Sequence, residues 1–262
     1  MDLPRTRAVA ARVEWVDEAG STNTELVARA TGSRSADWPT GSVLVTDTQT
    51  AGRGRLGRPW TAPPGSSLAI SLLLRPSAPP ATWGWLPLLA GGAMVGAVRA
   101  AGADADLKWP NDVLADGRKV CGVLAEVLPD GAGVVVGAGL NHLLERADLP
   151  VPTATSLLLE GASTDVDAVV ADYLQEALVL FRRWDAAGGD ARGSGLHAAV
   201  ATVLGTLGRR VRVTLPGGAA TEGRAVALDA DGRVVVQPDG AGPGVAEPQP
   251  VSAGDVEHLR YE

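Results

Sequence analysis

The chain has 262 residues and a formal net charge of −7, with 23 lysines and arginines against 30 aspartates and glutamates. This acidic balance argues against general nucleic-acid binding, which usually needs a basic face. Cys121 is the only cysteine, which excludes an internal disulfide and a Cys-X-X-Cys metal site. The length suits one large domain with an ample core together with a small domain.

The N-terminal part of the chain predicts short strands around one helix. Strand patterns cover residues 13–16, 42–47 and 67–74. A helix is expected to start at Ser21 or Thr22 and to run to about Ala30. Glu25 follows Thr22 by three residues, which is the spacing of a capping box.

The middle of the chain predicts a helix followed by hairpins. The helix covers residues 82–101, and residues 108–112 form a turn because Pro110 lacks an N–H donor and disfavours helix at the residue before it. Strand patterns then alternate with Asp-Gly pairs at 116–117 and 130–131, which are good hairpin signals. This order favours a mixed or antiparallel sheet with helices on one face.

No segment predicts a membrane span or a secretory signal. The most apolar helical stretch, residues 85–98, is shorter than the roughly 20 residues that cross a bilayer. Residues 1–13 contain no apolar run long enough for a signal peptide. We therefore expect no membrane association and a cytoplasmic location.

The C-terminal part predicts two helices and then a change of texture. Apolar residues recur at helical spacing from Val166 to Trp184, and a second helix covers residues 195–207. From Gly208 the chain alternates short strand patterns with glycine-containing turns, which is typical of a small β-barrel. We expect one domain over residues 1–207 and a second over residues 208–262.

The chemistry-bearing residues begin with a glycine- and arginine-rich loop, Gly52-Arg53-Gly54-Arg55-Leu56-Gly57-Arg58-Pro59-Trp60. Glycine lets a backbone come close to a ligand, and arginine offers a fixed fork of donors for carboxylate or phosphate. Such a loop suits a site that closes over an anionic small molecule. On the loop alone, a solvated basic loop or an RNA-contacting segment remains an alternative.

Lysine is used at two positions only, Lys108 and Lys119, whereas arginine occurs 21 times. A compact ammonium is not interchangeable with a guanidinium where one atom must be reached. The lysines lie in the blocks Lys108-Trp109-Pro110-Asn111-Asp112 and Lys119-Val120-Cys121-Gly122-Val123-Leu124-Ala125-Glu126. This context favours a functional interpretation of both over chance survival on a surface.

These blocks, together with Ser21-Thr22-Asn23, Gln49 and Gly137-Ala138-Gly139-Leu140-Asn141, resemble the biotin protein ligases in content and order. The resemblance covers about residues 13–262. It implies an α+β catalytic domain with a mixed or antiparallel sheet and helices on one face, similar to class II synthetases, and a small C-terminal SH3-like β-barrel. It also implies the reaction, in which ATP activates biotin to biotinyl-5′-AMP and the biotin passes to a lysine of a biotin carboxyl carrier domain.

The resemblance implies roles for individual residues. Lys119, Arg55 and Asp112 are the expected catalytic residues. Biotin is expected to contact Ser21, Thr22, Asn23, Gln49, Gly52, Arg53, Gly54, Arg55, Lys119, Gly122 and Gly137. ATP or the adenylate is expected to contact Arg55, Arg58, Trp60, Lys108, Asn111 and Asn141. No metal ligand is expected from the protein, because Mg²⁺ would be held mainly by the ATP phosphates.

Several roles stay open at this point. Ser21 and Thr22 could simply cap a helix, and Trp60 could stack on adenine or anchor the end of its loop. Asp112 could act on Mg²⁺, on the incoming lysine or only on its turn. Lys108 could contact phosphates or brace that turn.

The alternatives to this function are a lipoate ligase or lipoyl transferase of related fold, a nucleic-acid-binding protein and a regulator that only binds biotinyl-AMP. About 12 residues precede the first predicted strand, so we expect the type without a DNA-binding domain. The implied partners are the carrier domains of biotin-dependent carboxylases such as acetyl-CoA carboxylase. The oligomeric state stays open, with a homodimer among the alternatives.

Overall fold

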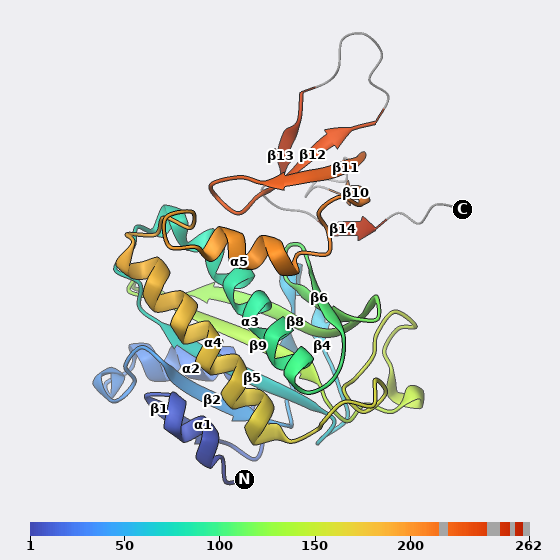
Figure 1. The fold of residues 1–262 in the computed structure, drawn as a ribbon. Helices are drawn as coiled ribbons and strands as arrows, with labels where there is room; N and C mark the ends of the chain where they lie inside the picture. The colour runs from blue at the N-terminus through green and yellow to red at the C-terminus, as the bar shows by residue number, and fades with distance from the viewer. Residues whose placement is uncertain (215–219, 240–246, 252–254, 259–262) are drawn as a thin grey trace.

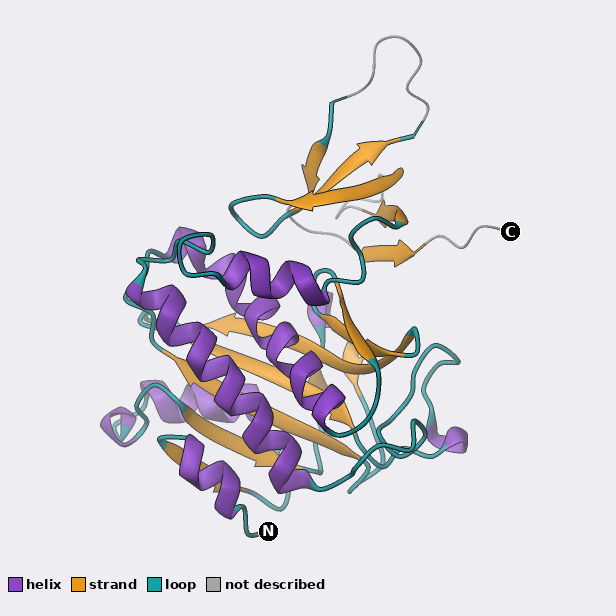
Figure 2. Ribbon diagram, in the orientation of Figure 1, coloured by secondary structure: helices purple, strands orange, loops and turns teal. Residues whose placement is uncertain are grey.

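The computed structural model describes residues 1–214, 220–239, 247–251 and 255–258. Its largest element is a seven-stranded sheet with the order β1-β2-β5-β9-β8-β7-β6 (Figures 1 and 2). β1 and β2 run parallel, and the other neighbours run antiparallel. The strands are β1 (Arg12–Trp15), β2 (Ser42–Thr46), β5 (Ser67–Leu74), β6 (Ala105–Lys108), β7 (Asp112–Ala115), β8 (Arg118–Val127) and β9 (Val134–Asn141).

Alternate residues of the central strands face two different layers. In β5, Ile70 and Leu72 belong to the large apolar core, which also contains residues of α3 (Leu86–Ala100) and α4 (Val166–Ala186). Leu73 belongs instead to a smaller cluster with α2 (Thr22–Thr31). α3 and α4 therefore cover one face of the sheet, and α2 covers part of the other (Figure 1).

The predicted fold class is confirmed. The sheet is mixed, α3 and α4 lie together on one face as expected, and a small β region follows at the C-terminus. The short helix α2 adds a covering element on the opposite face. That second face is only partly covered by α2, which leaves the space in which the site lies.

One helical stretch of the described residues, Pro80–Ala100, has the length and composition of a membrane span, with 21 residues and a mean hydropathy of 1.3. This stretch is longer than the apolar segment expected at residues 85–98, because a 3-10 turn, η3 (Pro80–Trp85), leads directly into α3. Most of it is buried inside the protein, including Leu89, Met94 and Val98. This burial is the pattern of a core helix.

Two elements, a short helix and a short strand, were not predicted from the sequence. α1 (Pro4–Val9) is short, and the Asp167 carboxylate of α4 accepts hydrogen bonds from the N–H groups of Arg5 and Thr6 at 2.9 Å each. β6 was missed because it is a four-residue strand, and its last residue, Lys108, pairs with Asp112 at the start of β7. The predicted turn is therefore confirmed at its centre but is shorter than expected. α5 (Leu196–Val203) also ends before the expected residue 207.

The described C-terminal residues form a five-stranded antiparallel sheet in the order β13-β12-β11-β10-β14. Its strands are β10 (Arg210–Thr214), β11 (Ala220–Leu228), β12 (Val234–Pro238), β13 (Gln249–Val251) and β14 (Asp255–His258). The turn before β7 is fastened to this region. The Trp109 N–H donates to Thr206 Oγ1 at 2.9 Å, and the Trp109 indole N–H donates to the Gly232 carbonyl at 3.0 Å.

The environment of His258, in the same region, leads us to expect that the stability of the protein depends on pH. Burial, and then the charges of Lys108 and Arg209, lower the pKa of His258 from its usual 6.5 to about 4. The unfolded chain therefore binds more protons than the folded chain between these two pH values, and stability falls as the pH drops through them. We expect the His258→Gln variant to show a weaker loss of thermal stability between pH 6.5 and 4 than the parent. An identical pH profile for the two proteins would contradict this expectation.

Candidate active site

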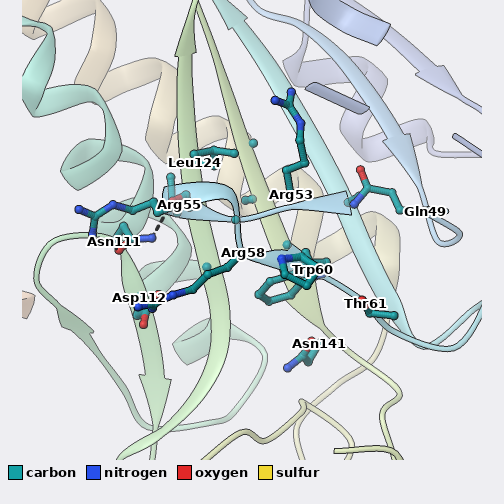
Figure 3. A pocket seen from close by; sticks show the side chains of 18 of the residues that line it. Gln49, Arg53, Arg55, Arg58, Trp60, Thr61, Asn111, Asp112, Leu124 and Asn141 are labelled. Atoms are coloured by element: carbon teal, nitrogen blue, oxygen red, sulfur yellow. Dashed lines mark hydrogen bonds between the residues drawn. The ribbon is translucent and has the colours of Figure 1, made fainter. Parts of the chain in front are cut away.

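A cavity of about 380 Å³ lies on the sheet face opposite α3 and α4, beneath the Gly/Arg loop (Figure 3). It collects residues from every predicted block. Its lining comprises Ser21, Thr22, Asn23, Gln49, Arg53, Gly54, Arg55, Arg58, Pro59, Trp60, Thr61, Ala69, Asn111, Asp112, Lys119, Gly122, Val123, Leu124, Gly137, Ala138, Gly139, Asn141, Pro150, Val151 and Ala154.

Glycines of two neighbouring strands line the floor of the cavity. Gly122 of β8 and Gly139 of β9 are register partners. A Cβ atom at Gly139 would lie 2.6 Å from Trp60 Cε2, and one at Gly137 would lie 2.3 Å from Asn23 Oδ1. The glycines therefore make room for Asn23 and Trp60 to approach the strands closely.

A buried polar network forms one end of the cavity. Gln49 Oε1 accepts from the Thr22 N–H at 2.9 Å, and Ser71 Oγ lies 2.8 Å from Thr22 Oγ1 and 2.6 Å from Asn23 Oδ1. Ser21 makes no side-chain cap on α2. The predicted capping box is wrong, because Glu25 accepts from the Gly20 N–H rather than from Thr22. These polar side chains therefore hydrogen-bond to one another at one end of the cavity.

Arg53 forms an ion pair with Glu126 beside this network. Its Nη2 lies 2.9 Å from Glu126 Oε1 and also donates to Thr24 Oγ1 at 2.9 Å. The Asn23 amide donates to the other Glu126 oxygen at 2.9 Å. Figure 3 shows the Arg53 guanidinium extended away from the Asn111 and Asp112 side of the cavity.

The rest of the Gly/Arg loop is a tight hairpin that reaches the turn before β7. β3 (Gly52–Arg53) pairs with β4 (Pro59–Trp60), and the 3-10 turn η2 (Arg55–Gly57) lies between them. Gly52 does not line the cavity, and a Cβ there would lie 2.4 Å from the Trp60 carbonyl oxygen. Gly52 is therefore required for the hairpin, in contrast to the predicted contact with biotin. Arg55 Nη1 donates to Asn111 Oδ1 at 3.0 Å.

Lys119 and Asp112 form the central ion pair. Lys119 Nζ lies 2.6 Å from Asp112 Oδ1, and both side chains are partly shielded, with 34% and 23% exposure. The same ammonium lies 5.5 Å from the centroid of a Trp60 ring, within cation–π range. Pairing of Asp112 with Lys119 was not among the roles considered from the sequence. It follows from the hairpin, which brings β7 and β8 side by side.

Lys108 and Cys121 lie outside the cavity lining. Lys108 instead lies near His258. Burial, and then the charge of Lys108, lower the pKa of His258. The expected contact of Lys108 with ATP is therefore not supported by its position. Cys121 is fully buried, and burial raises the pKa of its thiol to about 12. A buried, protonated thiol is not a nucleophile, which argues against a cysteine-based acyl transfer.

Several contributing residues were given no role from the sequence. Ser71 and Glu126 complete the polar network from the middle of strands β5 and β8, and Val151 and Ala154 form a wall from a loop. Alternation along the strand could have indicated that Ser71 faces away from the apolar core. No group of three or more His, Cys, Asp or Glu side chains suited to a metal ion occurs among the residues that the structure describes.

Two family models match the chain. The biotin/lipoate A/B protein ligase family matches residues 18–141, and the biotin protein ligase C-terminal domain matches residues 206–259. The first match contains most of the cavity-lining blocks, and the second covers most of the C-terminal sheet.

Individual proteins agree with these models. The biotin–[acetyl-CoA-carboxylase] ligase of Mycobacterium tuberculosis is 39% identical over 259 residues, which are 95% of this chain and 90% of that protein. The bifunctional ligase/repressor BirA of Escherichia coli is 34% identical over 57% of this chain and 50% of its own length. A structure of the biotin protein ligase from Aquifex aeolicus in complex with biotin and ATP has a TM-score of 0.74 and 25% identity, covering 95% of this chain and all of that one. On these family matches, sequence identities and the shared fold, the chain belongs to the biotin protein ligase family.

Proposed function

We propose that the chain is a biotin–[acetyl-CoA-carboxylase] ligase that works through biotinyl-5′-AMP. In the first step an oxygen of the biotin carboxylate attacks the α-phosphorus of ATP, and pyrophosphate leaves. In the second step a lysine amine of a carrier domain attacks the anhydride carbonyl, forms the amide and releases AMP. Biotin and ATP are both substrates of this reaction.

The observation that carries this proposal is the convergence of all the separate sequence blocks on one cavity. Its volume of about 380 Å³ is in the range of small-molecule sites. One end is a polar network around Asn23 that includes the Arg53–Glu126 ion pair, and the other end carries Lys119, Arg55 and Arg58. This division suits a molecule with a polar, uncharged ring and a carboxylate that must meet a phosphate.

Biotin is assigned to the end formed by Ser21, Thr22, Asn23 and Gln49, over Gly122 and Gly137. The amide and hydroxyl groups there can exchange hydrogen bonds with a ureido ring, which has both donors and acceptors. The missing side chains at Gly122 and Gly137 let Lys119, Trp60 and Asn23 lie close against the strands, and these side chains shape the space assigned to the ring and chain of biotin. Biotin extended from this end points its carboxylate toward Lys119.

Lys119 and Arg55 are assigned to the junction of the two anions. The attack brings a carboxylate and a triphosphate together, so fixed positive charge lowers the barrier by stabilising the charge that develops. Asp112 holds the Lys119 ammonium at 2.6 Å and so fixes where that charge lies. Arg58 and Asn141 line the same part of the cavity and are assigned to the nucleotide.

Trp60 and the Gly/Arg loop are assigned to closure over the intermediate. Trp60 lies against the floor at Gly139, with its ring near Lys119. A loop that covers the cavity excludes water, which would hydrolyse the mixed anhydride. The hydrogen bond from Arg55 to Asn111 connects this loop to the turn that carries Asp112.

Mg²⁺ is assigned to the phosphates of ATP rather than to a cage of protein side chains. The nearest candidate ligand, Asp112, is already paired with Lys119, and the described residues contain no cluster of metal-ligating side chains. This donor set fits an ion that keeps water and phosphate ligands. When bound, the ion neutralises phosphate charge and makes pyrophosphate a better leaving group.

The function is tested by ATP–pyrophosphate exchange with biotin, with lipoate measured in parallel. We expect exchange with biotin only, followed by amide labelling when an apo biotin carboxyl carrier domain is added. Exchange with lipoate alone would assign the chain to lipoate activation. Exchange with neither substrate would contradict both enzymatic functions.

The two lysines provide a matched pair of variants. We expect Lys119→Ala to lower the rate of adenylate formation by about a hundredfold to a thousandfold, which is typical for loss of one preorganised donor to developing charge. Lys108→Ala removes an equal charge outside the cavity and should change that rate by less than about threefold, within the usual scatter of about 0.5 kcal/mol for surface substitutions. Single-turnover formation of labelled adenylate measures both. Equal losses in the two variants would contradict the role of Lys119.

The loop is tested by Arg55→Gly. This variant loses the hydrogen bond to Asn111, so the loop should open more readily and release biotinyl-5′-AMP faster by about tenfold, or about 1.4 kcal/mol. Release of labelled adenylate after a chase with unlabelled biotin measures the rate. Unchanged release would show that Arg55 does not retain the intermediate.

A further inference from the structure

Lys119 is held by a segment that lies far away in the sequence. β9 ends at Asn141, and beyond this point Ala154 takes the neighbouring position beside β8 through a bridge to Lys119. The Lys119 N–H donates to the Thr153 carbonyl at 2.7 Å, and the Lys119 carbonyl accepts from the Thr155 N–H at 2.9 Å. Both backbone groups of Lys119 are therefore engaged by this segment.

Glu160 completes a ring of contacts around the Lys119 backbone, which consists of Arg118, Lys119, Thr155 and Glu160. Its Oε1 lies 2.9 Å from Nη2 of Arg118, the residue directly before Lys119, and it also accepts a hydrogen bond from the Thr155 hydroxyl. Only 11% of the Glu160 side chain is exposed, and Thr155 is fully buried. Charge-assisted contacts that are shielded from water are stronger than exposed ones, so the ring resists separation of the segment from β8.

The same segment forms one wall of the cavity. Pro150, Val151 and Ala154 line it, and the Asn141 amide donates to the Thr155 carbonyl at 3.0 Å. Glu160 itself is not a lining residue. Displacement of the segment would therefore move a wall of the cavity and the backbone of Lys119 together.

We propose that Glu160 is a positioning residue for adenylation, which acts by fixing the backbone of Lys119 through Arg118 and Thr155. The proposal rests on the proposed function, because Lys119 matters only if its ammonium faces the reacting anions. Loss of the ring lets the ammonium move from its position 2.6 Å from Asp112. A displacement of about 1 Å at a reacting centre lowers a rate by roughly a hundredfold.

The structural part of the proposal is tested without any activity. In the Glu160→Ala variant, amide hydrogen exchange at Lys119 and Thr155 should be about tenfold faster than in the parent, because the segment opens locally. The amide of Ile70, in the centre of β5, should exchange at the parent rate. Parent-like exchange at Lys119 and Thr155 would overturn the proposal even if the parent proved inactive as a ligase.

The catalytic part is tested by single-turnover adenylate formation in a parent that has first shown biotin-dependent exchange. Glu160→Ala should lower the rate by tenfold to a hundredfold, and Glu160→Gln, which keeps an acceptor oxygen, should recover it to within about threefold of the parent. Glu14→Ala is the control, because it removes an acid from another ion pair of 2.9 Å, with Arg29, outside the cavity. A normal rate in Glu160→Ala, or a loss of the same size in Glu14→Ala, would overturn the proposal.

A double-mutant cycle separates positioning of Lys119 from a general structural effect. If Glu160 acts through the lysine, Glu160→Ala should change the residual rate of the Lys119→Ala protein by less than about twofold. The same fold-loss in both backgrounds would show a merely structural role. If Glu160→Ala does not fold, Thr155→Val breaks the ring while keeping the pair with Arg118, and a parent-like rate in that variant would overturn the proposal.

Discussion

The cavity depends on strand positions that carry no side chain. In β9, Val136 and Leu140 are buried in the main core, while Gly137 and Gly139 alternate with them on the other face. Glycine inside a strand costs about 0.5–1 kcal/mol relative to alanine, because it packs nothing and is freer when unfolded. The apolar side of the same strand offsets this cost through its packing with α3 and α4. One strand can therefore stabilise the fold on one face and let cavity-lining side chains lie close against it on the other.

Hydrogen bonds across that open face join elements that packing alone does not hold together. Asn23 lies in the first turn of α2, and its amide donates to the Leu124 carbonyl and the Glu126 carboxylate of β8, while its oxygen accepts from Ser71 of β5. Glu126 in turn pairs with Arg53 of the loop. The helix α2, the sheet and the Gly/Arg loop therefore share one hydrogen-bond network, so that substitution of one member alters the hydrogen bonds of the others. The binding end of the cavity is preorganised by contacts within the protein itself.

The sequence predicted the parts of the site that depend on local pattern. The glycine- and arginine-rich loop, the turn around Pro110 and the Asp-Gly hairpins all have short-range signals, and the cavity collects nearly all the residues expected from them. Gly52 and Lys108 do not line it although their strand partners, Trp60 and Asp112, do, and residue type does not reveal this difference. Ser71, Glu126 and Glu160 were missed for the same reason. Each is an ordinary polar residue whose role arises from a partner more than 40 positions away in the chain.

Two cations of the cavity are paired with carboxylates of the protein, and this shapes how anions can bind. Lys119 is paired with Asp112, Arg53 with Glu126, and Arg55 donates to Asn111. These partners fix the cations at low conformational cost, which is the condition for electrostatic catalysis by preorganised groups. They also place the Asp112 carboxylate beside the cation that a phosphate would approach, and like charges at this distance repel. A triphosphate at this end of the cavity is therefore attracted by the Lys119 ammonium and repelled by the neighbouring Asp112 carboxylate. The ion pair that orients Lys119 thereby also limits the net positive charge that an approaching phosphate meets.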